Sequence, residues 1–393
     1  MMRQYAYLGE DGQVHVHDLD SDQEQIVSRA DAEGTEDAGG CACPTWSPDG
    51  TQLAYVRYEV TRGELRASAL HVALPDGTQS RLLHRFEGSL PIYMSWSPDG
   101  RRLALLLQTG RQLALHIVDA VGHGPLLVAA RGAPLYFAWH PDSNVLLTHA
   151  GRPGPVPGSR LAWVRLEADA AVSESLPVAA APAFRAPAWW TVRGAMTVAR
   201  GSGDSTEVVL VRPDTPDVEV LFACGAAPAF AWSPNGDILA CAGRKAPEDA
   251  SYEGISLFRP QEGKLEKLTE ASALAFFWAS GGRRLVYCTD LVGDRQVGLR
   301  LLDIESGGET DLGFVRPSRE QLLLFSHFDQ YRQSALLVSP SGNELLLAAS
   351  RAKESENGSV PTVRQIMLKS LGPESTERPV GRGRLAFWRP AIS

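Results

Sequence analysis

The segment FSHFDQYRQSA, Phe325–Ala335, concentrates side chains that can carry chemistry. An imidazole, a carboxylate, a guanidinium and two aromatic rings stand within six consecutive residues: His327, Phe328, Asp329, Gln330, Tyr331 and Arg332. His327 and Asp329 could form an acid–base pair, but nothing nearby supplies a nucleophile or a metal. Aromatic rings beside an arginine are typical of binding hot spots. The sequence therefore leaves two roles open for these six residues: they plug the channel or hold the last blade in place, or they bind a protein or peptide partner.

Arginines recur just after apolar stretches that resemble one another, at Arg57, Arg152, Arg200, Arg244 and Arg351. A guanidinium binds carboxylates and phosphates through paired hydrogen bonds, so these five residues are candidates for an anion site. The alternative is that each arginine pairs with a nearby loop acid such as Asp204 or Glu248.

The acidic run from Asp18 to Asp22 resembles the beginning of a calcium-binding loop. Such a loop needs glycine at its sixth position and a bidentate glutamate at its twelfth. Gln23 and Arg29 occupy those positions, which favours a solvated turn. The pair Cys41 and Cys43 has no second pair at metal-binding spacing. We therefore predict no metal site and no cofactor.

The elements that must hold these residues repeat along the chain. A tryptophan or valine precedes a turn-like sequence seven times, as in WSPDG, at Trp46, Trp96, Trp139, Trp190, Trp232, Trp278 and Val338. The six tryptophans are separated by 50, 43, 51, 42 and 46 residues. Periods of this length with several short strands per unit are typical of a β-propeller.

Each unit can be interpreted strand by strand. Proline fixes φ and glycine or asparagine tolerates positive φ, so WSPDG predicts a hairpin turn. Apolar runs such as "PIYMSW" and "RLALLL" flank the turn, as expected for strands covered on both faces. We expect the recurrent tryptophan to pack between adjacent units, because an indole ring buries a large apolar area.

The two ends of the chain complement each other. Residues 3–29 supply three strands without an inner one, and residues 383–390 supply an inner strand with nothing after it. We predict a single all-β domain over residues 1–393, an eight-bladed propeller of four-stranded antiparallel blades closed by pairing of the terminal strands. Seven blades is the alternative. The blades after the shared one are expected to start near residues 41, 91, 134, 185, 227, 273 and 333.

The WSPDG hairpin followed by an apolar strand resembles the repeat of TolB-type and WD-repeat-like propellers. It is also similar to the propeller domains of prolyl oligopeptidase and dipeptidyl peptidase relatives. The peptidase resemblance implies a separate hydrolase domain with a Gly-x-Ser-x-Gly elbow. The sequence contains no such pentapeptide and leaves no room for that domain after the blades are assigned.

Composition limits the partners. The formal net charge of −8 and pI near 5.7 argue against sequence-independent nucleic-acid binding, which needs a basic surface. No apolar stretch reaches the length of a membrane span, and the N-terminus has no signal-like apolar region. Five scattered cysteines are unlike a disulfide framework. We expect a soluble cytoplasmic protein.

Long connections predict where function lies. The segments between second and third strands and those between blades are long, and both kinds emerge on one face, which we call the long-loop face. Function on β scaffolds concentrates on loops. We predict a non-enzymatic scaffold that binds a protein or peptide partner with this face. The alternative is an enzyme of hydrolase or lyase type acting on a small molecule or sugar in the channel.

Overall fold

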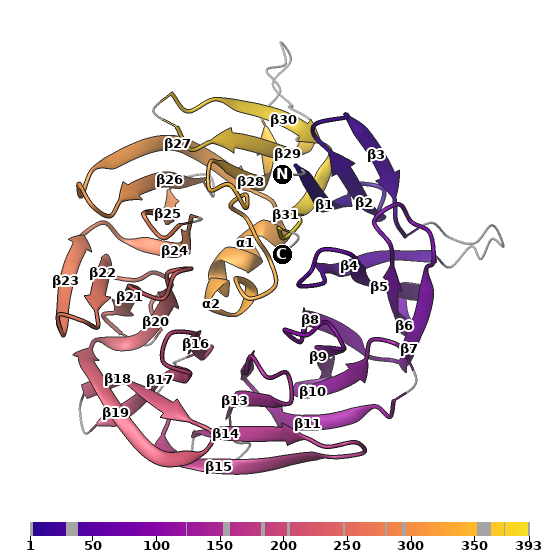
Figure 1. Ribbon diagram of the computed structural model, residues 1–393. Helices are drawn as coiled ribbons and strands as arrows, with labels where there is room; N and C mark the ends of the chain where they lie inside the picture. Colours follow the sequence, from indigo (N-terminus) through magenta and orange to yellow (C-terminus); the bar gives the residue numbers. More distant parts are fainter. Residues whose placement is uncertain are drawn as a thin grey trace.

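The computed structural model describes residues 3–28, 38–122, 124–151, 158–181, 185–202, 205–246, 248–279, 281–292, 296–351, 363–372 and 374–391. Over these ranges the chain forms antiparallel sheets arranged in a ring (Figure 1). Two short helices, α1 (Arg319–Ser326) and α2 (Phe328–Tyr331), lie inside the ring. Neither helix has the length and apolar character needed to cross a membrane.

Five four-stranded sheets follow one another around the ring, each built from the centre outwards. The first contains β4 (Ala38–Trp46), β5 (Leu53–Thr61), β6 (Glu64–Ala73) and β7 (Arg81–Glu87). The second contains β8 (Leu90–Trp96), β9 (Arg102–Thr109), β10 (Gln112–Asp119) and β11 (Leu127–Gly132). The third contains β12 (Leu135–Trp139), β13 (Val145–Gly151), β14 (Ser159–Leu166) and β15 (Ala171–Ala179). The fourth contains β16 (Ala188–Trp190), β17 (Ala195–Ser202), β18 (Ser205–Arg212) and β19 (Thr215–Cys224). The fifth contains β20 (Ala226–Trp232), β21 (Leu239–Arg244), β22 (Ile255–Arg259) and β23 (Lys264–Thr269).

A sixth sheet joins the two ends of the chain. Its strands are β3 (Gln23–Ile26), β2 (Val14–Asp18), β1 (Gln4–Gly9) and β31 (Gly383–Trp388), in that order. Strands β1 and β31 are antiparallel, with Tyr5 opposite Trp388 and Leu8 opposite Leu385. The Arg389 amide also donates to the Gln4 carbonyl oxygen at 2.9 Å. The predicted pairing of the terminal strands is confirmed.

The remaining strands form one seven-stranded sheet: β24 (Ala273–Trp278), β25 (Arg284–Val292), β26 (Gln296–Asp303), β27 (Glu309–Pro317), β28 (Glu344–Arg351), β29 (Val363–Ser370) and β30 (Glu377–Gly381). Over the described ranges there are thus seven hydrogen-bonded sheets, where the sequence predicted eight separate ones. The physical reason is local. The inner strand of the last unit is reduced to a bridge between Val338 and Leu345, and the end of β27 pairs with β28 instead, placing Arg316 opposite Ser350.

The WSPDG turn forms as its residues require. Gly50 has φ of +68°, a conformation that residues with a Cβ rarely adopt, and its amide donates to the Ser47 carbonyl oxygen at 2.8 Å. The Ser47 hydroxyl donates to Asp49 and accepts from the Gln52 amide, so the side chains fix the corner. The prediction of a hairpin turn is confirmed here.

The recurrent tryptophans connect neighbouring sheets. The Trp96 indole nitrogen donates to the Thr45 carbonyl oxygen at 3.2 Å, and that of Trp278 donates to the Ala231 carbonyl oxygen at 2.8 Å. Trp190 and Trp232 stack with ring centroids 4.1 Å apart. The predicted packing between adjacent units is confirmed, and the core lies in these interfaces.

Candidate functional site

The insertion singled out by the sequence folds into the channel. We call residues 318–335 the central plug; it enters after β27 and contains α1 and α2 (Figure 1). The Ser318 hydroxyl begins α1 by accepting from the Gln321 amide at 2.9 Å and also donates to the Arg384 carbonyl oxygen. The Gln321 side chain accepts from the Ala348 amide at 3.1 Å. The helix is therefore held against β28 and β31.

Phe328 anchors the plug through aromatic contacts. Its side chain is fully buried, with ring centroids 4.6 Å from Phe276, 5.9 Å from Phe277 and 5.9 Å from Tyr252. Tilted and edge-on ring pairs of this kind each stabilise the fold by about 0.5 to 1.5 kcal/mol beyond the effect of the area that the rings bury. Phe328 thus joins the plug to strand β24 and to the loop that contains Tyr252, just before strand β22.

Gln330 pairs with the inner strand β12 as a neighbouring strand would. Its side-chain amide donates to the Phe137 carbonyl oxygen and accepts from the Phe137 amide, both at 3.0 Å. The Gln330 carbonyl oxygen in turn accepts from the Tyr93 hydroxyl at 3.0 Å. These bonds satisfy backbone groups that the edge of an inner strand would otherwise leave unpaired.

Two arginine side chains, Arg185 and Arg332, lie near Asp329, which is only 2% exposed. One carboxylate oxygen accepts from the Ala186 amide at 3.1 Å, and the other has no hydrogen-bond partner in the described part of the chain. Arg185 donates to the Ser326 carbonyl oxygen beside it. Burial lowers the pKa of Arg332 to about 10, an effect that the Asp329 charge opposes. The carboxylate thus neutralises part of an arginine-rich region.

Two histidines near Asp329 are held neutral. Burial lowers the pKa of His327, and the charge of Arg185 lowers it further. Burial also lowers the pKa of His149, whose Nδ1 lies 3.0 Å from the Arg185 carbonyl oxygen. The charge of Asp329 opposes this shift at His327, and the acid–base pair suggested by the sequence stays a prediction.

Tyr331 lies against another inner strand, β8. The Tyr331 hydroxyl donates to the Ile92 carbonyl oxygen at 3.1 Å, and its ring lies edge-on to Tyr93 at 5.0 Å. The Arg332 amide donates to the Phe328 carbonyl oxygen at 2.8 Å. All six residues from 327 to 332 are therefore together in the plug. Partner binding through them stays a prediction, since Phe328, Asp329 and Gln330 are buried in this conformation.

The five candidate arginines have separate surroundings. Arg57 donates to the Ser28 carbonyl oxygen, and Arg200 pairs with Glu207 at 2.7 Å across strands β17 and β18. Arg244 is buried over the Tyr252 ring, with 4.8 Å from its guanidinium carbon to the ring centroid. Arg152 and the side chain of Arg351 lie outside the described residues. Of the three described arginines, Arg244 contributes charge near the plug, and anion binding stays a prediction.

The acidic run resembling a calcium loop forms a turn. Asp18 accepts from the Asp20 and Ser21 amides at 2.9 and 3.1 Å, and Asp22 lies 3.1 Å from a ring nitrogen of His17. The solvated turn is confirmed. Among the described residues no group of three or more His, Cys, Asp or Glu side chains could hold a metal ion. Burial raises the pKa of the Cys43 thiol to about 12.

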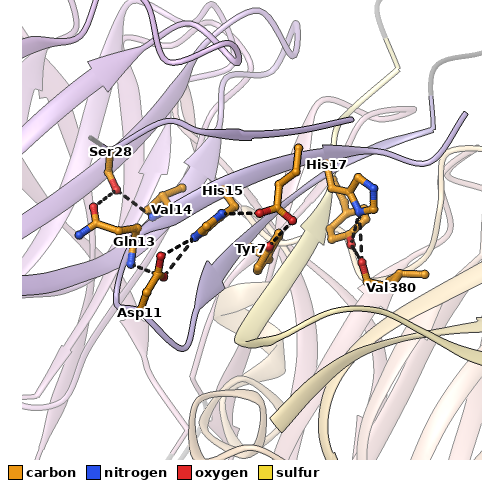
Figure 2. Close-up of polar contacts among 10 residues, drawn as sticks. Tyr7, Asp11, Gln13, Val14, His15, His17, Ser28 and Val380 are labelled. Atoms are coloured by element: carbon orange, nitrogen blue, oxygen red, sulfur yellow. Dashed lines mark hydrogen bonds and ion pairs between the residues drawn. The ribbon is translucent and has the colours of Figure 1, made fainter. Parts of the chain in front are cut away.

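A polar network in the closing sheet was missed from the sequence (Figure 2). His15 lies between two carboxylates, 3.0 Å from Glu24 and 3.0 Å from Asp11, and the Tyr7 hydroxyl donates to Glu24 at 2.6 Å. Burial and the bond to Glu24 raise the pKa of Tyr7. The signal was present in the alternation VHVHD, which places both histidines on one face of a strand.

The same network links two sheets. The Tyr5 hydroxyl donates to the Val380 carbonyl oxygen of β30 at 2.7 Å and lies 2.9 Å from Nδ1 of His17. Tyr5 is fully buried and its ring lies edge-on to Trp388 at 6.2 Å. These contacts stabilise the closing sheet rather than present reactive groups to a ligand.

A cavity of about 430 Å³ remains beside the plug. Its lining residues come mainly from α1 and from the inner strands β4, β8 and β31. Apolar walls come from Leu90, Ile92, Leu323, Leu385 and Phe387. Three charged residues that reach solvent also line the cavity, and we call them the rim: Arg319, Glu320 and Arg384. The cavity therefore combines an apolar interior with a charged rim.

Comparisons with known proteins agree on the fold alone. No family model and no curated protein matches the chain. A solved prolyl endopeptidase is 13% identical with a TM-score of 0.56, over 90% of this chain and half of that one. An oligogalacturonate lyase in complex with manganese is 12% identical with a TM-score of 0.53, over 95% and 97% of the two chains. TolB from Acinetobacter baumannii is 15% identical with a TM-score of 0.42, over 76% and 75%. The resemblance to propeller domains of prolyl oligopeptidase relatives thus holds for the fold, and the chain is a β-propeller similar to the endopeptidase and lyase structures.

Proposed function

We propose that this protein is a non-enzymatic scaffold that binds a protein or peptide partner with its long-loop face. The observation that supports this most directly is the central plug. The Tyr93 side chain of β8, the backbone of Phe137 in β12, the Ala186 amide and the Phe276 ring of β24 all contact the plug and hold it in the channel. A rigid surface loses little conformational entropy when a partner binds, which favours affinity.

Exposed charges on the two faces allow a matched experiment. Arg62 and Lys245 are exposed and follow second strands, which places them on the long-loop face. Arg101 lies in a WSPDG turn and Arg283 in the equivalent turn after Trp278, which places both on the opposite face, and both are exposed. Replacing each pair with glutamate changes the net charge equally. Any difference between the two variants then reports which face binds.

The protein should capture a stoichiometric partner from extracts of its native host. We expect Arg62→Glu with Lys245→Glu to reduce that capture by at least about tenfold, a free-energy change of roughly 1.4 kcal/mol. The variant with Arg101→Glu and Arg283→Glu should retain it. No captured partner, together with turnover in a broad hydrolase and lyase screen, would instead support the channel enzyme.

We also infer that the seven-stranded sheet represents two blades, so that the ring has eight. Strands β24 to β27 repeat the four-strand order of the other sheets. Strands β28 to β30 follow a WSPDG-like turn in which Gly342 has φ of +75°, and the bridge at Val338 occupies the inner position. An experimental structure that extends this bridge into a strand would support the count.

The proposed location is the cytoplasm. All five cysteines have free thiols: Cys41, Cys43, Cys224, Cys241 and Cys288. Reduced thiols are typical of the cytosol, and disulfides of exported proteins. Fractionation of native cells that placed the protein outside the cytoplasm would contradict this proposal.

A further inference from the structure

The plug packs unevenly, and this leaves apolar surface inside the channel. On α1, Leu324 and Phe325 are fully buried against the sheets, whereas Leu323 is 50% exposed and lines the cavity. Across the cavity, Leu90 and Ile92 of β8 are only partly buried. An apolar surface of this kind gains stability when an apolar group covers it.

The size of the cavity suits a small ligand group. Its volume of about 430 Å³ falls within the range of about 300–1,000 Å³ common for small-molecule sites. Such sites are mostly apolar and contain a few polar groups that orient the ligand. Here the charged groups are the three rim residues, so an occupant would bury an apolar part and leave a charged end at the rim.

The rim offers a cation without an ion-pair partner. Arg384 lies 3.7 Å from Glu320, so these two charges largely offset each other. Arg319 is exposed, lines the cavity and has no ion pair within the ranges that the structure describes. The polar end that suits this rim is therefore anionic, and a guanidinium matches the geometry of a carboxylate best.

We propose that the cavity binds an apolar group that carries a carboxylate, with the apolar part against Leu323 and the carboxylate at Arg319. The last residue of a polypeptide chain has this chemistry, and so does a medium-chain fatty acid. This inference rests on the proposed function, in which the long-loop face binds the partner. It deepens that function by naming the chemical group that this face would recognise.

Calorimetric titration with two carboxylates distinguishes a fatty acid from the C-terminus of a polypeptide as the ligand. One is decanoate, and the other is a hexapeptide that ends in phenylalanine with a free carboxylate. We expect at least one of them to bind with one site per chain. Binding of decanoate alone assigns a small amphipathic acid, and binding of the peptide alone assigns a chain terminus.

Variants test the two parts of the cavity. Leu323→Asp should weaken binding about tenfold or more, because it places a charge on the apolar wall. Arg319→Ala should weaken the binding of the ligand with a free carboxylate by a similar factor. The same peptide with an amidated C-terminus should bind more weakly to the parent protein, and Arg319→Ala should leave that binding unchanged. Leu82→Asp is the matched control, since Leu82 is 55% exposed on the outer strand β7.

The inference is wrong if neither carboxylate binds up to millimolar concentration, or if Leu323→Asp and Leu82→Asp have equal effects. Circular dichroism and thermal melting check that each variant is folded; if Leu323→Asp fails to fold, Arg319→Ala decides. Failed titrations with a captured partner would contradict this inference and leave the proposed function standing. Successful titrations without any captured partner would support this inference and contradict the proposed function.

Discussion

At the scale of single residues, Gln330 connects parts of the chain that are far apart in sequence. Its side chain satisfies both backbone groups of Phe137, 193 residues away, and its own carbonyl oxygen accepts from Tyr93. All three residues are buried, so water does not replace these bonds. The cost of removing them is therefore the cost of leaving buried polar groups unpaired.

Gln330→Ala should lower the free energy of unfolding by about 2 to 4 kcal/mol, because it leaves the Phe137 amide without a partner and the Phe137 carbonyl oxygen with only its long contact to Gln333. Urea denaturation measures the change. Gln333→Ala is the control: its side chain is exposed and its contacts to the Phe137, Pro187 and Asp329 carbonyl oxygens are long, at 3.4 to 3.5 Å. Equal effects of the two substitutions would show that the bonds to Phe137 contribute little.

The neutral histidines beside the plug predict a dependence of stability on pH. The pKa values of His149 and His327 are lowered in the folded protein, mainly by burial. In the unfolded chain a histidine has a pKa near about 6.5. As the pH falls below that value, the unfolded chain takes up protons before the folded one does, so stability decreases.

Between pH 7.5 and pH 5 the free energy of unfolding should therefore decrease, with a slope of up to about 1.4 kcal/mol per pH unit for each histidine. Replacing His149 and His327 with glutamine should flatten this part of the curve. His140→Gln, in the turn after β12, serves as the control. A parent slope that the double substitution leaves unchanged would assign the pH dependence to other groups.

At the scale of elements, the sequence predicts the structures that depend on local residues. The turn at Gly50 follows from proline, aspartate and glycine in fixed order, and the tryptophan period follows from the repeat. The plug appeared only as one of two alternatives, because its position depends on contacts with distant strands such as that of Gln330 with Phe137. The arginines recur in sequence, yet Arg200 pairs with a cross-strand neighbour, Glu207, that no pattern singles out.

The plug itself is tested by replacing Phe328 and Tyr331 with alanine. Phe328 is fully buried, so its removal leaves a cavity and should cost about 3 to 5 kcal/mol of stability. Tyr331→Ala also removes the bond to the Ile92 carbonyl oxygen. Phe314→Ala, which removes an aromatic ring that is 55% exposed on β27, should change stability little. A double variant that melts like the parent but no longer binds its partner would show that the two rings serve recognition instead.

At the scale of the whole molecule, the ring depends on a strand from each end of the chain. Strand β31 contributes Trp388, which is 1% exposed, and it covers the edge of β1. It also reaches the plug through the Arg384 carbonyl oxygen, which accepts from Ser318, and its Trp388 amide donates to the carbonyl oxygen of Leu336, the residue that follows the plug, at 2.8 Å. The closing strand therefore stabilises the sheet and the channel together.

Deleting residues 383–393 should expose the edge of β1 and the apolar faces that Leu385 and Trp388 cover. An uncovered edge invites pairing with other chains, so we expect aggregation, or a loss of more than about 5 kcal/mol because several core side chains are lost at once. Deleting only residues 391–393, which follow the strand, is the control and should leave thermal melting unchanged. If the longer deletion also left the melting temperature and the solubility unchanged, the ring would not need the terminal strand, and the stabilising contacts would have to lie between the other sheets and the plug.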